Sequence, residues 1–131
     1  MAIEVATFGG REVLIGSPSH ISAVDVASPF AALVTAFSQE ELNEVLGVAG
    51  LLLKLGCQEF CCVGSEAELL HDQLDWLVED ADRLDVVTTW HTDIAEGCEY
   101  FLFAAGGQRL VLYALISRHP EIMDRMSLAS Q

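Results

Sequence analysis

Three segments of the chain repeat one order of features: an apolar, strand-like run, then a polar residue able to cap a helix, then an acid three positions later. The runs are residues 31–37, 59–63 and 85–90, and the caps with their acids are Ser38 with Glu41, Ser65 with Glu68, and Asp93 with Glu96. In a capping box, a serine accepts a hydrogen bond from the third helical amide and a glutamate there reaches back to the cap. Strand and capped helix in repetition are typical of parallel βαβ units, so we expect an α/β fold.

The helices expected after these strands cover residues 39–55, 66–81 and 94–105. The first should end at Gly56, where glycine can adopt the left-handed cap conformation, and the third at Gly106 and Gly107. Within these runs, residues 31–37, 60–63 and 86–89 form short apolar stretches rather than alternating ones, which favours a sheet covered on both faces.

The N-terminal segment has a different pattern, because Gly9 and Gly10 separate two strand-like runs at residues 3–8 and 11–15. A two-residue Gly-Gly link between such runs predicts a β-hairpin. Residues 21–26 are expected to add a short edge strand and residues 109–116 a last strand. Pro120 can open a short C-terminal helix that reaches about Met126.

With 131 residues, the chain is long enough for one compact domain and too short for two ordinary ones. We expect a three-layer βαβ sandwich with a mainly parallel central sheet of about four strands plus an N-terminal β-hairpin. The single domain, residues 1–131, would comprise the hairpin and edge segment at 1–28, a βα core at 29–118, and a short helix and tail at 119–131.

The chain is strongly acidic, with six Lys and Arg against twenty Asp and Glu and a formal net charge of −14. The acids are concentrated, because residues 66–99 hold eleven of them and a single base, Arg83. Such a field repels nucleic acid and anionic membranes and accelerates encounters with a cationic protein surface. The simpler explanation is that the charge keeps an apolar protein in solution.

Neither a membrane span nor a secretory signal is visible in the sequence. The longest apolar run, residues 45–53, is far shorter than the roughly 20 residues that cross a bilayer. Residues 1–10 lack a basic start and a continuous apolar block. The expected location is the cytoplasm.

One face of the second predicted helix carries an acidic stripe, because its acids recur at alternating steps of four and three residues. The stripe consists of Glu68, Asp72, Asp75, Glu79 and Asp82. Like charges at this spacing weaken a helix by a few tenths of a kcal/mol per pair, so the arrangement indicates a cationic partner. Trp76 lies about 80° from the centre of the stripe and is expected to anchor that partner, unless it packs against a loop or the C-terminal helix.

A second constellation lies at the carboxyl edge of the predicted sheet, where open α/β folds bind ligands. There His91 stands beside Trp90 and close to Thr89 and Asp93, which could make it a general base with an orienting partner. Against catalysis, no serine or cysteine forms a nucleophile elbow, and Asp93 already serves as a helix cap. The catalytic hypothesis therefore remains the alternative one.

Metal, phosphate and disulfide sites find little support. The cysteines lack the paired spacing of a zinc site, and the adjacent Cys61 and Cys62 would point to opposite faces of a strand, so all four are expected to be buried and reduced. The histidines are scattered along the chain, at positions 20, 71, 91 and 119. The loops after the strands are not rich in glycine. We predict no metal and no cofactor.

The residues 86–93, with the sequence VVTTWHTD, resemble a family of small bacterial domains of unknown function through a V-x-T-T-W-H motif. Asp75-Trp76 on the preceding helix and Tyr100-Phe101 on the next extend the resemblance, which covers about residues 31–116 and leaves out the hairpin. Acids follow the Trp-His pair sooner in the family's pattern than here, where Thr92 intervenes. The resemblance implies a bacterial origin and an α/β fold and assigns no reaction.

These observations favour a binding protein over an enzyme. The first hypothesis is a bacterial immunity or antitoxin-like protein that neutralises a basic toxin by covering its active site. The alternative is a small α/β enzyme or ligand-binding domain with a site around His91. A homodimer, formed through residues 100–103 or the C-terminal helix, is a third possibility.

Overall fold

The computed structural model describes residues 4–8, 11–18, 29–105, 111–116 and 119–129. Its strands are β1 (Glu4–Phe8), β2 (Arg11–Gly16), β3 (Phe30–Thr35), β4 (Cys57–Val63), β5 (Val87–His91) and β6 (Val111–Leu115). Its helices are α1 (Gln39–Leu55), α2 (Ala67–Asp80), α3 (Ile94–Phe103) and α4 (Pro120–Ala129). From β3 onward, strands and helices alternate, as the repeated strand and cap pattern predicted.

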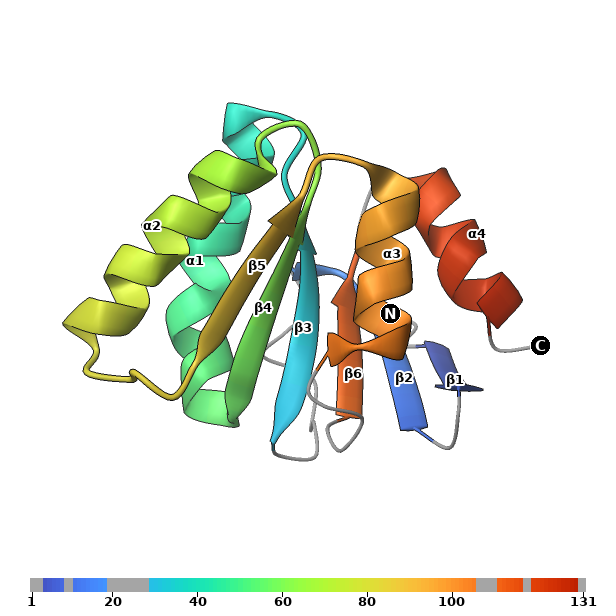
Figure 1. The fold of residues 1–131 in the computed structure, drawn as a ribbon, viewed down its shortest axis with the longest axis horizontal. Coiled ribbons are helices and arrows are strands. Elements are labelled where there is room, and N and C mark those ends of the chain that lie inside the picture. The colour runs from blue at the N-terminus through green and yellow to red at the C-terminus, as the bar shows by residue number, and fades with distance from the viewer. Residues whose placement is uncertain (1–3, 9–10, 19–28, 106–110, 117–118, 130–131) are drawn as a thin grey trace.

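The described strands form one six-stranded sheet in the order β1-β2-β6-β3-β4-β5 (Figure 1). Five neighbouring strands are mutually parallel, namely β2, β6, β3, β4 and β5, and β1 pairs antiparallel with β2. The predicted α/β fold with a mainly parallel sheet is confirmed. The expected number of about four parallel strands was too low, because β2 joins the main sheet beside β6. The Gly9-Gly10 turn and the edge strand predicted at residues 21–26 lie outside the described residues.

Helices cover both faces of the sheet. Helices α1 and α2 pack on one face, and α3 and α4 pack on the other (Figure 1). The adjacent Cys61 and Cys62 belong to different cores, as predicted from strand alternation, and all four cysteines are free and buried. Among the described residues, no helix is long and apolar enough to cross a membrane.

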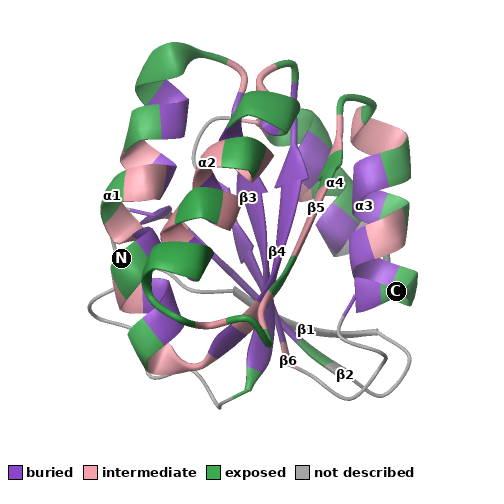
Figure 2. Cartoon of the chain, turned by 60° about the vertical axis from the view of Figure 1, so that its left-hand side comes forward, coloured by how far each residue is buried: buried purple, intermediate pink, exposed green. Residues whose placement is uncertain are grey.

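The two faces are not equally covered along the sheet. Strands β3 and β4 are almost completely buried, whereas every residue of the edge strand β5 is at least partly exposed (Figure 2). The prediction of a strand buried on both faces is therefore wrong for β5. Val87 and Trp90 are both exposed, because β5 has a neighbouring strand on one side alone among the described strands.

Helix α1 has the predicted bounds. Its Ser38 cap accepts a hydrogen bond from the Glu41 N–H at 3.1 Å, and Gly56 ends it with φ 108°. The Glu41 carboxylate accepts from the N–H of Phe37 at 2.6 Å. The capping box predicted the N–H of Ser38, one residue later. Asp93 caps α3 as predicted by accepting from the Glu96 N–H at 3.0 Å.

The capping box predicted for α2 is wrong. The cap position is Glu66, which makes no side-chain cap bond, and the Ser65 hydroxyl donates to the Phe37 carbonyl oxygen at 3.4 Å. The reason is that the Glu66 N–H donates to the Ala36 carbonyl oxygen at 2.9 Å and ties this loop to the end of β3. Gly64 makes the turn with φ 134°, a conformation that favours glycine.

Candidate functional site

The acidic stripe lies on the outer side of α2, away from the sheet. Glu68, Asp72 and Glu79 are exposed, and the core face of the helix is formed by Ala67, Leu70, Leu74 and Val78. Asp82 lies beyond the end of α2 and has a left-handed backbone conformation, with φ 57°. It therefore does not continue the helical stripe. The exposed carboxylates therefore form a shorter surface than the sequence predicted.

A histidine of α2, His71, contacts two carboxylates of the stripe. The Nδ1 atom of His71 is 3.0 Å from Asp72 Oδ1, and its Nε2 atom is 3.6 Å from Asp75 Oδ2. Asp75 also accepts a hydrogen bond from the Thr88 hydroxyl of β5. Asp75 therefore links α2 to β5 rather than facing solvent freely.

Trp76 stands beside the exposed carboxylates with 70% of its surface accessible. With this exposure it is not buried under a loop or helix of the described chain, as the alternative interpretation required. The indole borders a hollow of about 320 Å³ between α1 and α2, lined by Leu46, Asp72, Gln73, Trp76 and Leu77. This surface combines apolar side chains at its centre with carboxylates at its margin.

His91, Thr89 and Asp93 lie close in sequence at the carboxyl end of β5, and their side chains have different surroundings. Asp93 is occupied as the cap of α3. The Thr89 hydroxyl is buried toward Cys61 and Tyr100. Within the described part of the chain, no hydrogen bond or ion pair joins His91 to either residue, and its ring instead packs on Tyr100 with centroids 5.3 Å apart.

A buried carboxylate beneath this region was not predicted. Glu59 of β4 is buried, and the Tyr100 hydroxyl of α3 donates to its Oε2 atom at 2.5 Å. The Cys61 thiol lies 3.5 Å from the same oxygen. Burial raises the pKa of Tyr100, and the hydrogen bond to Glu59 raises it further. A glutamate inside an otherwise apolar strand was the sequence signal for this pair.

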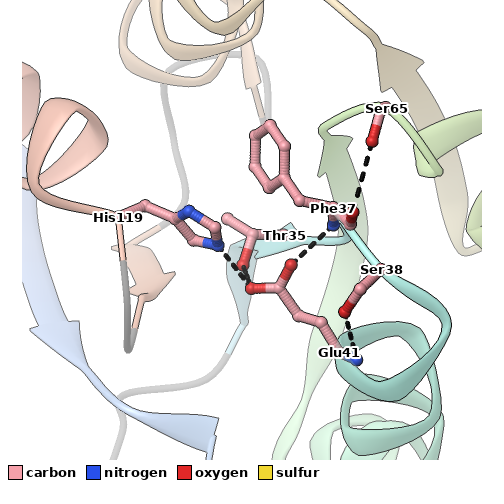
Figure 3. A network of polar contacts seen from close by, with 6 residues as sticks. All are labelled: Thr35, Phe37, Ser38, Glu41, Ser65 and His119. Atoms are coloured by element: carbon pink, nitrogen blue, oxygen red, sulfur yellow. Dashed lines mark hydrogen bonds and ion pairs between the residues drawn. The ribbon is translucent and has the colours of Figure 1, made fainter.

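A second polar cluster occupies the point where the strand order reverses (Figure 3). Strands β4 and β5 lie on one side of β3, and β6 lies on its other side. The carboxyl ends of β3 and β6 therefore flank the place where open α/β sheets bind ligands. Glu41, only 6% exposed, lies there. It accepts from the Thr35 hydroxyl at 2.8 Å and from the Phe37 N–H at 2.6 Å, and His119 Nε2 is 2.5 Å away.

The electrostatics of this cluster favour an ionised carboxylate. Burial by itself would raise the pKa of Glu41, but hydrogen bonds from His119, the Phe37 amide and Thr35 together outweigh burial and lower the pKa. Phe37 and Ser38, which follow β3, and Ser65, which follows β4, border the cluster. The sequence held no sign of His119, which reaches the cluster from the start of α4.

The site residues differ in what they can do. Glu41 already contacts three protein groups, so its cluster is suited to holding α1 and α4 together. The α2 surface and the region beside His91 and Tyr100 remain open to solvent. Among the described residues, no group of three His, Cys, Asp or Glu side chains could hold a metal ion.

Residues 12–124 match a family model described as "Domain of unknown function (DUF7684)". The match begins in β2 and ends in α4, so it is wider than the stretch of residues 31–116 on which the resemblance to an uncharacterised family rested. The chain matches no curated protein.

Proposed function

The chain belongs to this family of domains of unknown function, and we propose from its own surface that it is an acidic protein-binding domain. The observation that carries the proposal is Trp76, which is 70% exposed between the carboxylates of α2 and the hollow over α1. A large aromatic side chain left in water beside a concave apolar surface is a common feature of an interaction site.

The charges around Trp76 define the kind of partner. Asp72 and Glu79 are exposed, and Arg83, the base nearest in sequence, is occupied by Asp85 at 3.2 Å and by the Leu53 carbonyl oxygen at 3.4 Å. A cationic protein surface would meet mainly carboxylates here. Complementary charge of this kind raises association rates, while burial of the aromatic anchor supplies affinity.

The biological role that suits this surface best is that of a bacterial immunity or antitoxin-like protein in the cytoplasm. Enzymes that act on nucleic acid or nucleotides often have basic active sites, and an acidic domain can block such a site by covering it. The size and the net charge of −14 support this role. The catalytic hypothesis at His91 stays a prediction. Within the described part of the chain, no hydrogen bond or ion pair joins Thr89 or Asp93 to that imidazole.

The test begins with the reading frames that flank the gene for this chain, one of which should encode a basic protein, and then measures the binding of that protein. Isothermal titration should give a complex with the wild type and none with the double variant Asp72→Lys and Glu79→Lys. The matched control is Glu12→Lys with Asp124→Lys, which changes the net charge equally at exposed positions away from α2. An equal loss of affinity in both double variants would mean that net charge alone determines binding, and it would contradict the proposed surface.

A further inference from the structure

A second hollow, separate from the α2 surface, lies between α3 and the carboxyl end of β5. Its volume is about 400 Å³, and it is shallow and open to solvent. It is lined by His91, Glu96, Glu99, Tyr100 and Phe103. Each of these side chains is either an aromatic ring or a carboxylate, and the four from α3 are spaced so that they share one face of the helix.

The rings in this hollow are held in place from below. The Tyr100 hydroxyl donates to the buried Glu59 carboxylate at 2.5 Å, which points the polar end of the tyrosine into the protein. The His91 ring packs against Tyr100 with an interplanar angle of 36°. Phe103, at the end of α3, is 56% exposed. Aromatic surface is therefore presented to solvent on an ordered support.

The chemistry of the lining selects a positive ligand. The face of an aromatic ring carries negative electrostatic potential and attracts ammonium and guanidinium groups, and carboxylates at the margin add to that attraction. An anion would be repelled by Glu96 and Glu99. A neutral apolar molecule would gain from the rings but nothing from the carboxylates.

Among the described residues, no lysine or arginine lines this hollow. Arg125 of α4 lines a neighbouring hollow on the other side of α3, which shares Glu99 and Phe103 with the first. Its guanidinium is paired with Glu121 at 3.8 Å. Glu96 borders the first hollow but not the second, so it is the carboxylate most directly available to a ligand there.

We propose that the hollow formed by His91, Tyr100, Phe103, Glu96 and Glu99 binds an organic cation, an alkylammonium or guanidinium group. The group can come from a free small molecule or from a lysine or arginine side chain of another protein. The site lies on the face of the sheet opposite α2, so it does not depend on the function proposed for Trp76.

The test is a titration followed by ¹H–¹⁵N correlation spectra of the whole chain at constant ionic strength. Tetramethylammonium and methylguanidinium should shift amide signals around β5 and α3 in a saturable way. The neutral molecule tert-butanol, which resembles tetramethylammonium in shape, should bind at least several-fold more weakly. Equal binding of tert-butanol, or shifts spread evenly over all acidic residues, would overturn the proposal.

Variants then assign the lining. Phe103→Ala and the double variant Glu96→Gln with Glu99→Gln should each weaken binding of tetramethylammonium several-fold. The matched control, Glu68→Gln with Glu79→Gln on α2, removes the same charge and should leave binding unchanged. Because Phe103, Glu96 and Glu99 are exposed, these variants are expected to fold, which unfolding in urea will verify. Unchanged binding in the folded Glu96 and Glu99 double variant would overturn the proposal.

A further arm separates the two sources of the cation. A short peptide with one lysine is compared with butylamine, and an acetyl-lysine peptide serves as the uncharged control. Tighter binding of the lysine peptide than of butylamine would identify a protein side chain as the ligand, and equal binding would identify a small molecule. Binding of the acetylated peptide as strong as that of the lysine peptide would contradict recognition of charge.

Discussion

The Nε2 atom of His119 lies 2.5 Å from the Oε2 atom of Glu41, although 78 positions separate the two residues in sequence. The contact joins the start of α4 to the first turn of α1 across the reversal point of the sheet. Phe37 strengthens the junction, because its ring packs on the imidazole with centroids 4.4 Å apart. The place where related folds bind ligands is therefore filled by an internal connection.

The Glu41 carboxylate should be important for stability. Glu41→Ala removes the shared acceptor of Thr35, Phe37 and His119, so it should lower the free energy of unfolding by about 2 to 4 kcal/mol in urea titrations. The neighbouring Glu40→Ala, at an exposed position, should change it by roughly 0.5 kcal/mol or less. Equal effects of the two substitutions would contradict the role given to Glu41.

The same carboxylate should make stability depend on pH in acid. Folding lowers the pKa of Glu41 below its ordinary value of 4.5, so near and below that pH the unfolded chain binds more protons than the folded one. The contribution is complete above pH 4.5 and is lost as the pH falls through the folded pKa. The measurement is the free energy of unfolding in urea for the wild type and for Glu41→Gln, from neutral pH into the acid range. The other acids titrate in both proteins, so the difference between the two free energies reports Glu41. The stability difference should shrink on acidification, and a constant difference would count against the mechanism.

Two glycine substitutions should act in opposite directions. A Cβ atom at Gly64 would lie 2.2 Å from the Ala36 carbonyl oxygen, and its φ of 134° is unfavourable for alanine. Gly64→Ala should therefore destabilise the fold by about 3 kcal/mol or more. A Cβ atom at Gly47 of α1 would meet no other group of the described chain within 4 Å, so Gly47→Ala should stabilise by roughly 0.5 to 1 kcal/mol. Thermal or urea unfolding gives both signs directly.

Tyr100 and Glu59 should show energetic coupling. Tyr100→Phe keeps the ring but removes a hydrogen bond to a buried carboxylate, which should cost about 1 to 3 kcal/mol in urea unfolding. In a double-mutant cycle with Glu59→Gln, the two losses should not add, because the residues share one contact. Additive losses would show that the 2.5 Å contact contributes little in solution.

The parts of the structure that the sequence predicted are those determined within a few residues. The bounds of α1 followed from Ser38 and Glu41 at its N-terminus and from Gly56 at its C-terminus. Each of these residues acts on the helix end beside it. The capping box at Ser65 was wrong because Phe37, 28 residues earlier at the end of β3, competes for the hydroxyl. No local pattern records such a competitor.

The unpredicted parts of the site depend on pairs that the fold brings together. Glu59 and Tyr100 are 41 positions apart, and the pairing of β2 with β6 joins segments about a hundred residues apart in the sequence. The acidic stripe was visible because helical periodicity is local. The contact that ties Asp75 to the sheet depends on Thr88, which only the tertiary structure places beside that carboxylate.

Trp76 should report the charge of its surroundings through fluorescence quenching. Because it is exposed beside Asp72 and Glu79, caesium ions should be concentrated near the indole and iodide ions depleted. Each quenching constant is divided by that of N-acetyl-tryptophanamide, which removes the intrinsic difference between the two ions. The normalised constant for caesium should then exceed that for iodide, most clearly at low ionic strength.

Two variants assign this effect to the α2 surface. Trp76→Phe leaves Trp90 as the remaining tryptophan and should remove most of the difference between the ions. Asp72→Asn with Glu79→Gln should reduce the difference while the indole stays exposed, because the local field is weakened and the fold is not. A difference that survives both changes would have to come from the overall charge of −14, and it would argue against a localised acidic surface for a cationic partner.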